Sequence, residues 1–462
     1  MILKSLLLVW LCVPVCLQAV LPRSELLRPK DRWVVVGDSI TQNGTYYAWV
    51  ALYYLTRYPD MDFSVVNAGI SGDNATKALS RYSWDIACSH ASVATVMFGM
   101  NDIGRSLYGV DSPSEKILQR RKMAMDDYQE SLTTLVKRLK EDGMRVILLS
   151  PSPYDDTAEV KSENHKGANL ALRACADYMR ELSKREQVDF IDIHKPMTEL
   201  NQQRQAQDPT LTLTGPDRIH PQTPGHVVAA YFMLTSAGVT GEVSNVVLDY
   251  QTKRVVDVQR ATVSDLSFSP DEMSFTLLEE ALPYPLGKYG APAREWIPLE
   301  QSLSREVLRI KNLPSGNYRL SIDDIEIANM SAQELGQGVN LGTHQNTPQY
   351  LQAQEVLRVL MEWRYNVGYR KRAIAQIEYW TLGHLKKPVD VLTGVTAATK
   401  KREEVAQSAD SKKDYILGLL DRYLEWKARE AEIDERIKRL FQQARVKARP
   451  VSHQYTIKRI AD

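Results

Sequence analysis

The chain has 462 residues, more than one ordinary hydrophobic core organises, so its length predicts two or three domains. Hydrophobic residues make up 44% and charged residues 25%, a balance typical of globular proteins that excludes a disordered or fibrous chain. The formal net charge of +1 provides no global field for nucleic acid, so we expect no nucleic-acid partner.

The first 19 residues have the pattern of an export signal. Lys4 supplies the positive charge, residues 6–17 are almost wholly apolar, and Ala19 is a small residue suited to a cleavage point. The apolar run is too short to span a bilayer, and an uncleaved N-terminal anchor is the alternative. We therefore expect a secreted or periplasmic protein with no membrane span after cleavage.

Cleavage of this signal would leave two cysteines, Cys88 and Cys175. Two cysteines allow one disulfide but define no disulfide framework. Both lie in apolar or helical surroundings, so two buried free thiols are at least as consistent with the sequence as a disulfide.

Residues 20–240 are predicted to form an alternating β/α domain. Short apolar runs rich in β-branched residues have the pattern of buried parallel strands, at residues 33–36, 63–66, 93–98, 145–149 and 188–193. Helical segments alternate with them, at residues 46–58, 124–141, 168–184 and 225–234. This alternation predicts a three-layer α/β/α fold with a five-stranded parallel sheet covered on both faces.

Four polar motifs come after strands of this predicted sheet. Their sequences are GDSIT at residues 37–41, NAGISGD at 67–73, GMND at 99–102 and DRIHP at 217–221, after the first, second, third and fifth strands. In an open parallel sheet the ligand crevice lies at the carboxyl ends of the strands. We therefore expect these motifs to meet at one edge of the sheet.

Ser39, Asp217 and His220 have the chemistry of a serine hydrolase. A histidine that acts as a base needs a carboxylate on its other ring nitrogen, and Asp217 precedes His220 by three residues, which places both on one side of a turn. A serine after a strand is otherwise most often a helix N-cap, which is the alternative for Ser39. The G-x-S-x-G motif does not occur around Ser39, which argues against an α/β-hydrolase.

The four motifs resemble, in order and in position, the sequence blocks of the SGNH (GDSL-like) hydrolase family over residues 30–240. The first block carries Ser39, the second Gly72, the third Asn101, and the last both Asp217 and His220. The resemblance implies hydrolysis of esters or thioesters by a Ser-His-Asp acyl-enzyme mechanism. It also implies that the reaction needs no metal and no cofactor.

The resemblance further implies an oxyanion hole that holds the negative charge of the tetrahedral intermediate. Its donors would be the Ser39 N–H, the Gly72 N–H and the side-chain amide of Asn101. Gly69 is the alternative to Gly72, and a loop-tying role is the alternative for Asn101. His226 is expected to be structural.

After residue 240 the pattern changes. Short strand-like runs predict a β-rich module over residues 241–345, at 246–250, 254–258, 273–278, 307–310 and 318–322, with residues 281–285 as a linker or edge segment. Residues 346–462 are predicted to be helical, with helices over 351–363 and 415–444 and a possible final strand over 452–460. We expect the long helix to pack on its own molecule; a dimerising coiled coil is the alternative, so a homodimer through the C-terminal helices is possible.

Three functions fit these patterns. The first is an exported esterase that removes O-acetyl groups from a glycan, so that an acylated carbohydrate is the substrate. The second is an esterase, lipase or thioesterase for small or lipid esters, and the third is a non-catalytic glycan-binding protein. The complete residue set argues against the third, and the lack of a long apolar lid argues against a lipase. A sequon at Asn43 lies four residues from Ser39, where a glycan would block the crevice, so bacterial export is favoured.

Overall fold

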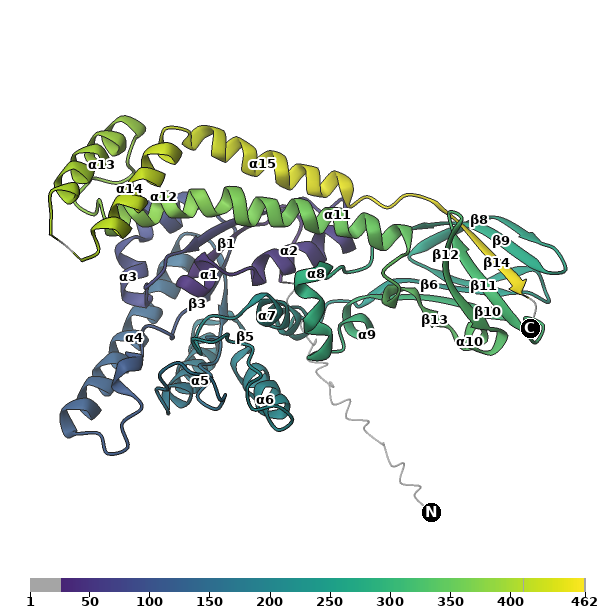
Figure 1. Ribbon diagram of the computed structural model, residues 1–462, viewed down its shortest axis with the longest axis horizontal. Helices are drawn as coiled ribbons and strands as arrows, with labels where there is room; N and C mark the ends of the chain where they lie inside the picture. The colour runs from purple at the N-terminus through teal and green to yellow at the C-terminus, as the bar shows by residue number, and fades with distance from the viewer. Residues whose placement is uncertain (1–25, 410, 461–462) are drawn as a thin grey trace, which may run out of the picture.

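Figure 1 shows the computed structural model, which describes residues 26–409 and 411–460. The predicted export signal lies outside the described residues. A sheet flanked by helices, the catalytic domain, fills the lower left of the view. A long layer of C-terminal helices runs above it, and a β module lies at the right. No helix within the described ranges is long and apolar enough to cross a membrane.

The central sheet has five parallel strands in the order β2-β1-β3-β4-β5, which confirms the predicted α/β/α fold class. Its strands are β1 (Arg32–Gly37), β2 (Ser64–Gly69), β3 (Val93–Met97), β4 (Arg145–Leu149) and β5 (Asp189–Ile191). Gly37 pairs in register with both Gly69 and Met97, so the carboxyl ends of the neighbouring strands β2, β1 and β3 are level. The motifs that follow these strands therefore begin at one edge.

Seven α-helices of the described chain belong to this domain. They are α1 (Ser39–Gln42), α2 (Tyr46–Arg57), α3 (Ala75–Ser80), α4 (Glu115–Glu141), α5 (Ala168–Glu186), α6 (His194–Gln205) and α7 (Thr223–Ser236). All four predicted helices are present. Helix α4 begins at Glu115, earlier than predicted, because its exposed first turns are polar and show no apolar period; Ser114 caps it. Helices α1 and α3 are too short to show an apolar period, and α6 is too polar, so these three helices were not predicted.

The β module consists of two sheets with strand orders β13-β10-β6-β7 and β12-β11-β14-β9-β8. The strands are β6 (Glu242–Asp249), β7 (Arg254–Gln259), β8 (Ala261–Phe268), β9 (Glu272–Glu279), β10 (Arg305–Lys311), β11 (Asn317–Ile322), β12 (Ile325–Ser331), β13 (Val339–Asn340) and β14 (His453–Ile460). The final strand β14 returns from the helical region, as predicted, and pairs antiparallel with β9 and β11. Strands β8 and β12 lie at the two ends of their sheet; β8 has no buried residue and β12 has two, so their sequences lack the apolar run that marks a buried strand.

The prediction of a linker or edge segment over residues 281–285 is wrong. Leu282 and Tyr284 are buried in the main core. The Leu282 N–H donates to the Thr56 carbonyl at 2.9 Å, and the Tyr284 hydroxyl donates to the Trp49 carbonyl at 2.9 Å. Two prolines gave the segment the composition of a linker, although its apolar residues fill the junction between the module and α2.

The C-terminal layer contains α11 (Pro348–Glu362), α12 (Tyr369–Trp380), α13 (Val391–Ala406), α14 (Lys413–Lys427) and α15 (Glu430–Lys447), while the short helices α8 (Gly287–Gly290), α9 (Leu299–Leu303) and α10 (Ala332–Gln337) precede it. The single helix predicted over residues 415–444 is wrong, because α14 ends at Lys427 and α15 begins at Glu430. Apolar residues recur on both sides of this break, so their spacing did not reveal it.

The apolar face of α15 packs on its own molecule rather than remaining free for a second copy. The Phe441 ring lies against Phe63 of the catalytic domain and Trp363, with ring centres 5.3 and 5.6 Å apart. Apolar residues of the catalytic domain and of the helical layer form one continuous core. A homodimer through the C-terminal helices stays a prediction.

Both remaining cysteines are free. Cys175 is buried, as expected, but Cys88 is exposed, so the expectation of two buried thiols is wrong for Cys88. Its S–H donates to the Trp84 carbonyl, four residues earlier in the chain.

Candidate active site

The first motif turns sharply from β1 into α1. The buried Asp38 carboxylate accepts the Ile40 N–H at 2.8 Å and so caps α1, which makes Ser39 the first residue of a one-turn helix. A side chain at Gly37 would collide with Thr41, so only glycine fits this turn. Burial raises the pKa of Asp38 to about 7, against the lowering effect of the Ile40 hydrogen bond.

Ser39, His220 and Asp217 form a continuous hydrogen-bonded relay. The Ser39 Oγ lies 2.8 Å from His220 Nε2, and His220 Nδ1 lies 2.6 Å from Asp217 Oδ2. A carboxylate at Nδ1 holds the proton there, which leaves Nε2 free to accept the serine proton. The structure thus brings together the three side chains that the sequence pointed to.

The Asp217 carboxylate is fixed in its charged form. Burial alone would raise its pKa, but hydrogen bonds from the backbone and ring of His220 and from the Ile219 N–H outweigh burial and hold the pKa below its usual value. The other carboxylate oxygen accepts both backbone N–H groups at 2.9 and 3.0 Å, so the carboxylate cannot rotate away from the ring.

The prediction that the last motif directly follows the fifth strand is wrong. Helix α6 and a loop intervene, and the motif immediately precedes α7. Within it, Arg218 adopts a left-handed φ of 67° and is buried. Its guanidinium donates to the carbonyl oxygens of Asp155, Ala158, Val160 and Ser162, which anchors the histidine loop to the segment after β4. This anchor could not be predicted from the sequence, because its partners are backbone atoms.

Gly72 opens toward empty space beside the nucleophile loop. It has a left-handed φ of 77°, and a Cβ there would meet no atom within 4 Å. The N–H of the alternative donor Gly69 is already engaged by the Asn67 side chain at 2.8 Å. The geometry therefore favours Gly72 as the backbone donor for an oxyanion.

The Asn101 side chain lies at the same edge. Its Nδ2 donates to the Asp73 carbonyl at 2.7 Å and to Asp38 Oδ2 at 3.5 Å, and the second of these hydrogen bonds is the weaker. Arg105 Nη1 donates to Asn101 Oδ1 at 3.0 Å, which fixes which end of the amide faces the crevice. The role of Arg105 was not predicted from the sequence, since this residue lies beyond the end of the third motif.

The neighbouring Asp102 fixes the loop. It is buried and accepts the N–H groups of Gly99 and Ala75 at 2.8 Å each, which ties the third motif to α3. Burial raises its pKa to about 6, opposed by these hydrogen bonds. His226 is also structural: it is buried, it stacks on Tyr46, and burial lowers its pKa to about 3.

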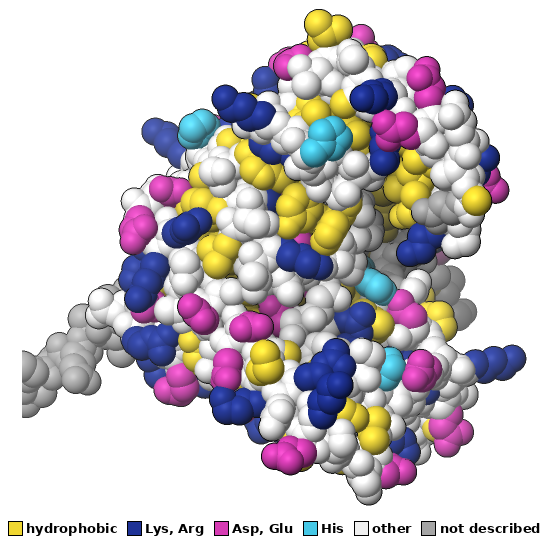
Figure 2. Space-filling model, turned by 90° about the vertical axis from the view of Figure 1, so that its left-hand side faces the viewer, with side chains coloured by type: hydrophobic (Ala, Val, Ile, Leu, Met, Phe, Trp, Pro, Cys, Tyr) yellow, Lys and Arg dark blue, Asp and Glu magenta, His cyan; other side chains and the backbone are white. Residues whose placement is uncertain are grey.

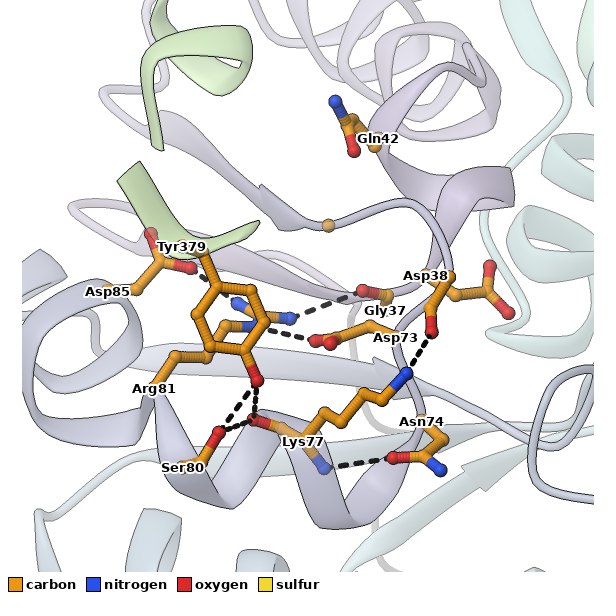
Figure 3. Close-up of polar contacts among 12 residues, drawn as sticks. Gly37, Asp38, Gln42, Asp73, Asn74, Lys77, Ser80, Arg81, Asp85 and Tyr379 are labelled. Atoms are coloured by element: carbon orange, nitrogen blue, oxygen red, sulfur yellow. Dashed lines mark hydrogen bonds and ion pairs between the residues drawn. The ribbon is translucent and has the colours of Figure 1, made fainter. Parts of the chain in front are cut away.

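A buried charge cluster joins the first and second motifs (Figure 3). Arg81 is fully buried and donates to Asp73 at 2.6 Å, to Asp85, and to the Gly37 carbonyl at 3.3 Å. From the C-terminal layer, Arg372 pairs with both oxygens of Asp85 at 2.7 and 3.0 Å. Two guanidinium groups therefore neutralise two buried carboxylates directly behind the site.

The C-terminal helices reach the site through further contacts that the sequence did not indicate. Arg364 donates to the carbonyl oxygens of Gln42 and Gly44 at 2.8 and 2.6 Å. Gln42, at the end of α1, donates in turn to Gln376 of α12 at 2.7 Å. Helix α12 thus holds the far end of the helix that begins at Ser39.

Among residues 26–409 and 411–460, no group of three or more histidine, cysteine, aspartate or glutamate side chains could hold a metal ion. The site is instead a hydroxyl, an imidazole and a carboxylate in series, beside a glycine and an amide that can face a developing negative charge. This arrangement defines a serine hydrolase.

Residues 35–228 match the GDSL-like lipase/acylhydrolase family, and this domain belongs to that family, the SGNH hydrolases. The chain is 22% identical over 223 residues to an acetylxylan esterase from Geobacillus stearothermophilus, and the alignment covers 45% of this chain and 94% of that protein. Together with the site, these matches make the protein a carboxylic ester hydrolase.

Among solved structures, BT4096, a gut microbial diltiazem-metabolizing enzyme, is 29% identical and aligns over 95% of this chain and 99% of its own, with a TM-score of 0.86. Its similarity therefore includes the β module and the helical layer. The crystal structure of the Geobacillus stearothermophilus acetylxylan esterase Axe2 is 22% identical and aligns over 46% of this chain and 95% of its own, with a TM-score of 0.37.

Proposed function

We propose that this protein is an exported serine esterase that removes O-acetyl groups from a glycan. The observation that carries the chemistry is the relay from the Ser39 hydroxyl through His220 to Asp217, with contacts of 2.8 and 2.6 Å.

The steps follow from this geometry. Ser39 Oγ forms a bond to the acyl carbon while His220 Nε2 takes the serine proton, and Asp217 stabilises the imidazolium. The Ser39 and Gly72 N–H groups and Asn101 Nδ2 hold the oxyanion. When the ester C–O bond breaks, His220 gives its proton to the leaving alcohol. A water molecule then releases the acid from Ser39 by the same route.

The polar surroundings of the nucleophile support a small acyl group and a hydroxyl-rich alcohol. Asn43 Nδ2 donates to the Ser71 hydroxyl at 3.1 Å, and Lys77 Nζ donates to the Gly72 carbonyl at 2.9 Å. Arg105 lies beside Asn101 and adds a second cationic side chain. Long lipid chains bind in apolar clefts instead. The acetylxylan esterase relative and the apolar segment at residues 6–17 also support glycan deacetylation after export.

A second candidate function is hydrolysis of small esters that are not carbohydrates. The relative that aligns over 95% of this chain metabolizes diltiazem, so the same architecture acts on a small molecule there. This candidate uses the same relay and differs only in the alcohol that leaves.

The two functions are separated by comparing acetylated xylooligosaccharides with p-nitrophenyl acetate, butyrate and octanoate, with Ser39→Ala as the inactive control. We expect acetate to be preferred over the longer acids and the sugar acetates to be hydrolysed with the higher kcat/KM. Hydrolysis of p-nitrophenyl acetate without any action on sugar acetates would favour the second function. A preference for octanoate would overturn both.

A further inference from the structure

The C-terminal end of α12 carries a tryptophan beside the second motif. The indole N–H of Trp380 donates to the Ser71 carbonyl at 3.3 Å, and Ser71 directly precedes Gly72. Lys77 Nζ lies 2.9 Å from the Gly72 carbonyl and 4.6 Å from the centre of the Trp380 ring. Figure 3 shows Lys77 extending from α3 toward the loop that carries Asp38.

We propose that Trp380 and Lys77 form a subsite for the sugar ring that carries the acetyl group. This inference rests on the proposed function, because it names the part of the protein that recognises the alcohol. Trp380 lies outside residues 35–228, the part that matches the family, so the subsite joins the C-terminal layer to the catalytic domain.

The exposure of Trp380 supports a binding role. Tryptophan is usually well buried, but this side chain is 47% exposed, although its indole N–H and its neighbours hold it in place. Tyr379 lies against it, with ring centres 4.9 Å apart and planes tilted by 55°. A rigid aromatic surface is therefore open to solvent next to the oxyanion loop.

Lys77 supplies polar contacts at the same place. Across the described chain it forms no ion pair within 4 Å, and one of its three N–H groups is engaged, by the Gly72 carbonyl. Figure 2 shows the end of the molecule that α3, α4, α13 and α14 form, where apolar side chains lie among lysine and arginine side chains between the helical layer and the catalytic domain.

This combination fits a carbohydrate better than it fits a lipid or an aromatic alcohol. A sugar ring presents C–H groups that pack on an aromatic face and hydroxyls that accept hydrogen bonds from an ammonium. A lipid chain would leave the other two N–H groups of the Lys77 ammonium without an acceptor in the ligand. An aromatic alcohol would use the ring but not the ammonium.

The test compares Trp380→Ala and Trp380→Phe with Tyr415→Ala, a matched control that removes a 62% exposed aromatic residue from α14, elsewhere in the helical layer. For each variant, kcat/KM is measured on acetylated xylooligosaccharide and on p-nitrophenyl acetate, and folding is checked by circular dichroism. Trp380→Ala should lower the ratio of kcat/KM on acetylated xylooligosaccharide to kcat/KM on p-nitrophenyl acetate by about 3–10-fold. Trp380→Phe should lower this ratio by less, and Tyr415→Ala should leave it unchanged.

An unchanged ratio in Trp380→Ala would overturn the subsite, whether both activities stay the same or both fall together, because a common fall would mean that Trp380 acts only through the Gly72 loop. Wild-type protein that hydrolyses p-nitrophenyl acetate but no sugar acetate would instead overturn the proposed function and the subsite with it. A binding measurement checks the result independently of turnover: in the Ser39→Ala background, Trp380→Ala should weaken xylooligosaccharide binding by a similar factor.

Discussion

Arg372→Met should destabilise the folded protein by about 3–4 kcal/mol. Arg372 and Asp85 are each only 7% exposed, and the guanidinium makes two hydrogen bonds to the carboxylate and one, at 3.0 Å, to the Gly69 carbonyl. Removing one partner of a buried ion pair typically costs about 3–5 kcal/mol, because the other charge stays buried. We expect the lower part of this range, since Arg81 still pairs with Asp85.

The charge of Asp85 explains the size of this effect. Burial alone would raise the pKa of its carboxyl, but Arg372 and Arg81 outweigh burial and hold the pKa below its usual value. Without Arg372, burial opposes the charge more strongly and the carboxylate loses two of its hydrogen bonds. The contact between α12 and the second motif should therefore weaken first.

The assay is urea unfolding followed by circular dichroism and tryptophan fluorescence, with Arg358→Met as the matched control. Arg358 pairs with Glu355 on α11, but the two side chains are 56% and 49% exposed, so their pair should contribute about 0–1 kcal/mol. Arg372→Met should unfold at clearly lower urea than the control. Equal midpoints for the two variants would refute the reasoning that Arg372 ties the C-terminal layer to the site.

Three further predictions concern the oxyanion hole and the β module. Asn101→Ala should lower kcat about 10²–10³-fold with little change in KM, and an effect on KM alone would show that Asn101 binds substrate instead. Arg105→Met should lower kcat about 10-fold in the wild type but cause little further loss in Asn101→Ala, as a double-mutant cycle would measure, because Arg105 orients that amide. Burial raises the pKa of the Glu279 and Glu306 carboxyls above the ordinary glutamate value of 4.5, so the folded protein holds protons that the unfolded chain releases. Stability should therefore fall as pH rises above about 4.5, and Glu306→Gln should flatten this dependence in urea titrations; an unchanged slope would contradict it.

The catalytic domain was predictable because its signals are local. Buried parallel strands are short apolar runs, and the relay pairs Asp217 with His220 three residues later in one turn. The polar motifs after the first three strands meet because the level register of Gly37, Gly69 and Met97 brings them together. These patterns depend on neighbouring residues within the domain and not on contacts with the rest of the chain.

The remainder depends on contacts between distant segments, which leave no periodic pattern. Arg372 and Arg364 come from the helical layer and bind backbone carbonyls or a single carboxylate more than 280 residues away in the chain. Arg218 likewise binds only carbonyl oxygens. Residues 281–285 resembled a linker because proline content shows in composition, whereas burial against α2 does not.

The most direct test of the account is the identity of the acylated residue. The protein is treated with an acyl-mimicking phosphonate ester and digested, and the modified peptide is identified by mass spectrometry, while Ser39→Ala is assayed on p-nitrophenyl acetate with its folding checked by circular dichroism. The relay from Ser39 to Asp217 predicts one adduct per chain, on Ser39, and a folded Ser39→Ala protein without measurable hydrolysis. An adduct on another residue, or retained activity in Ser39→Ala, would contradict it.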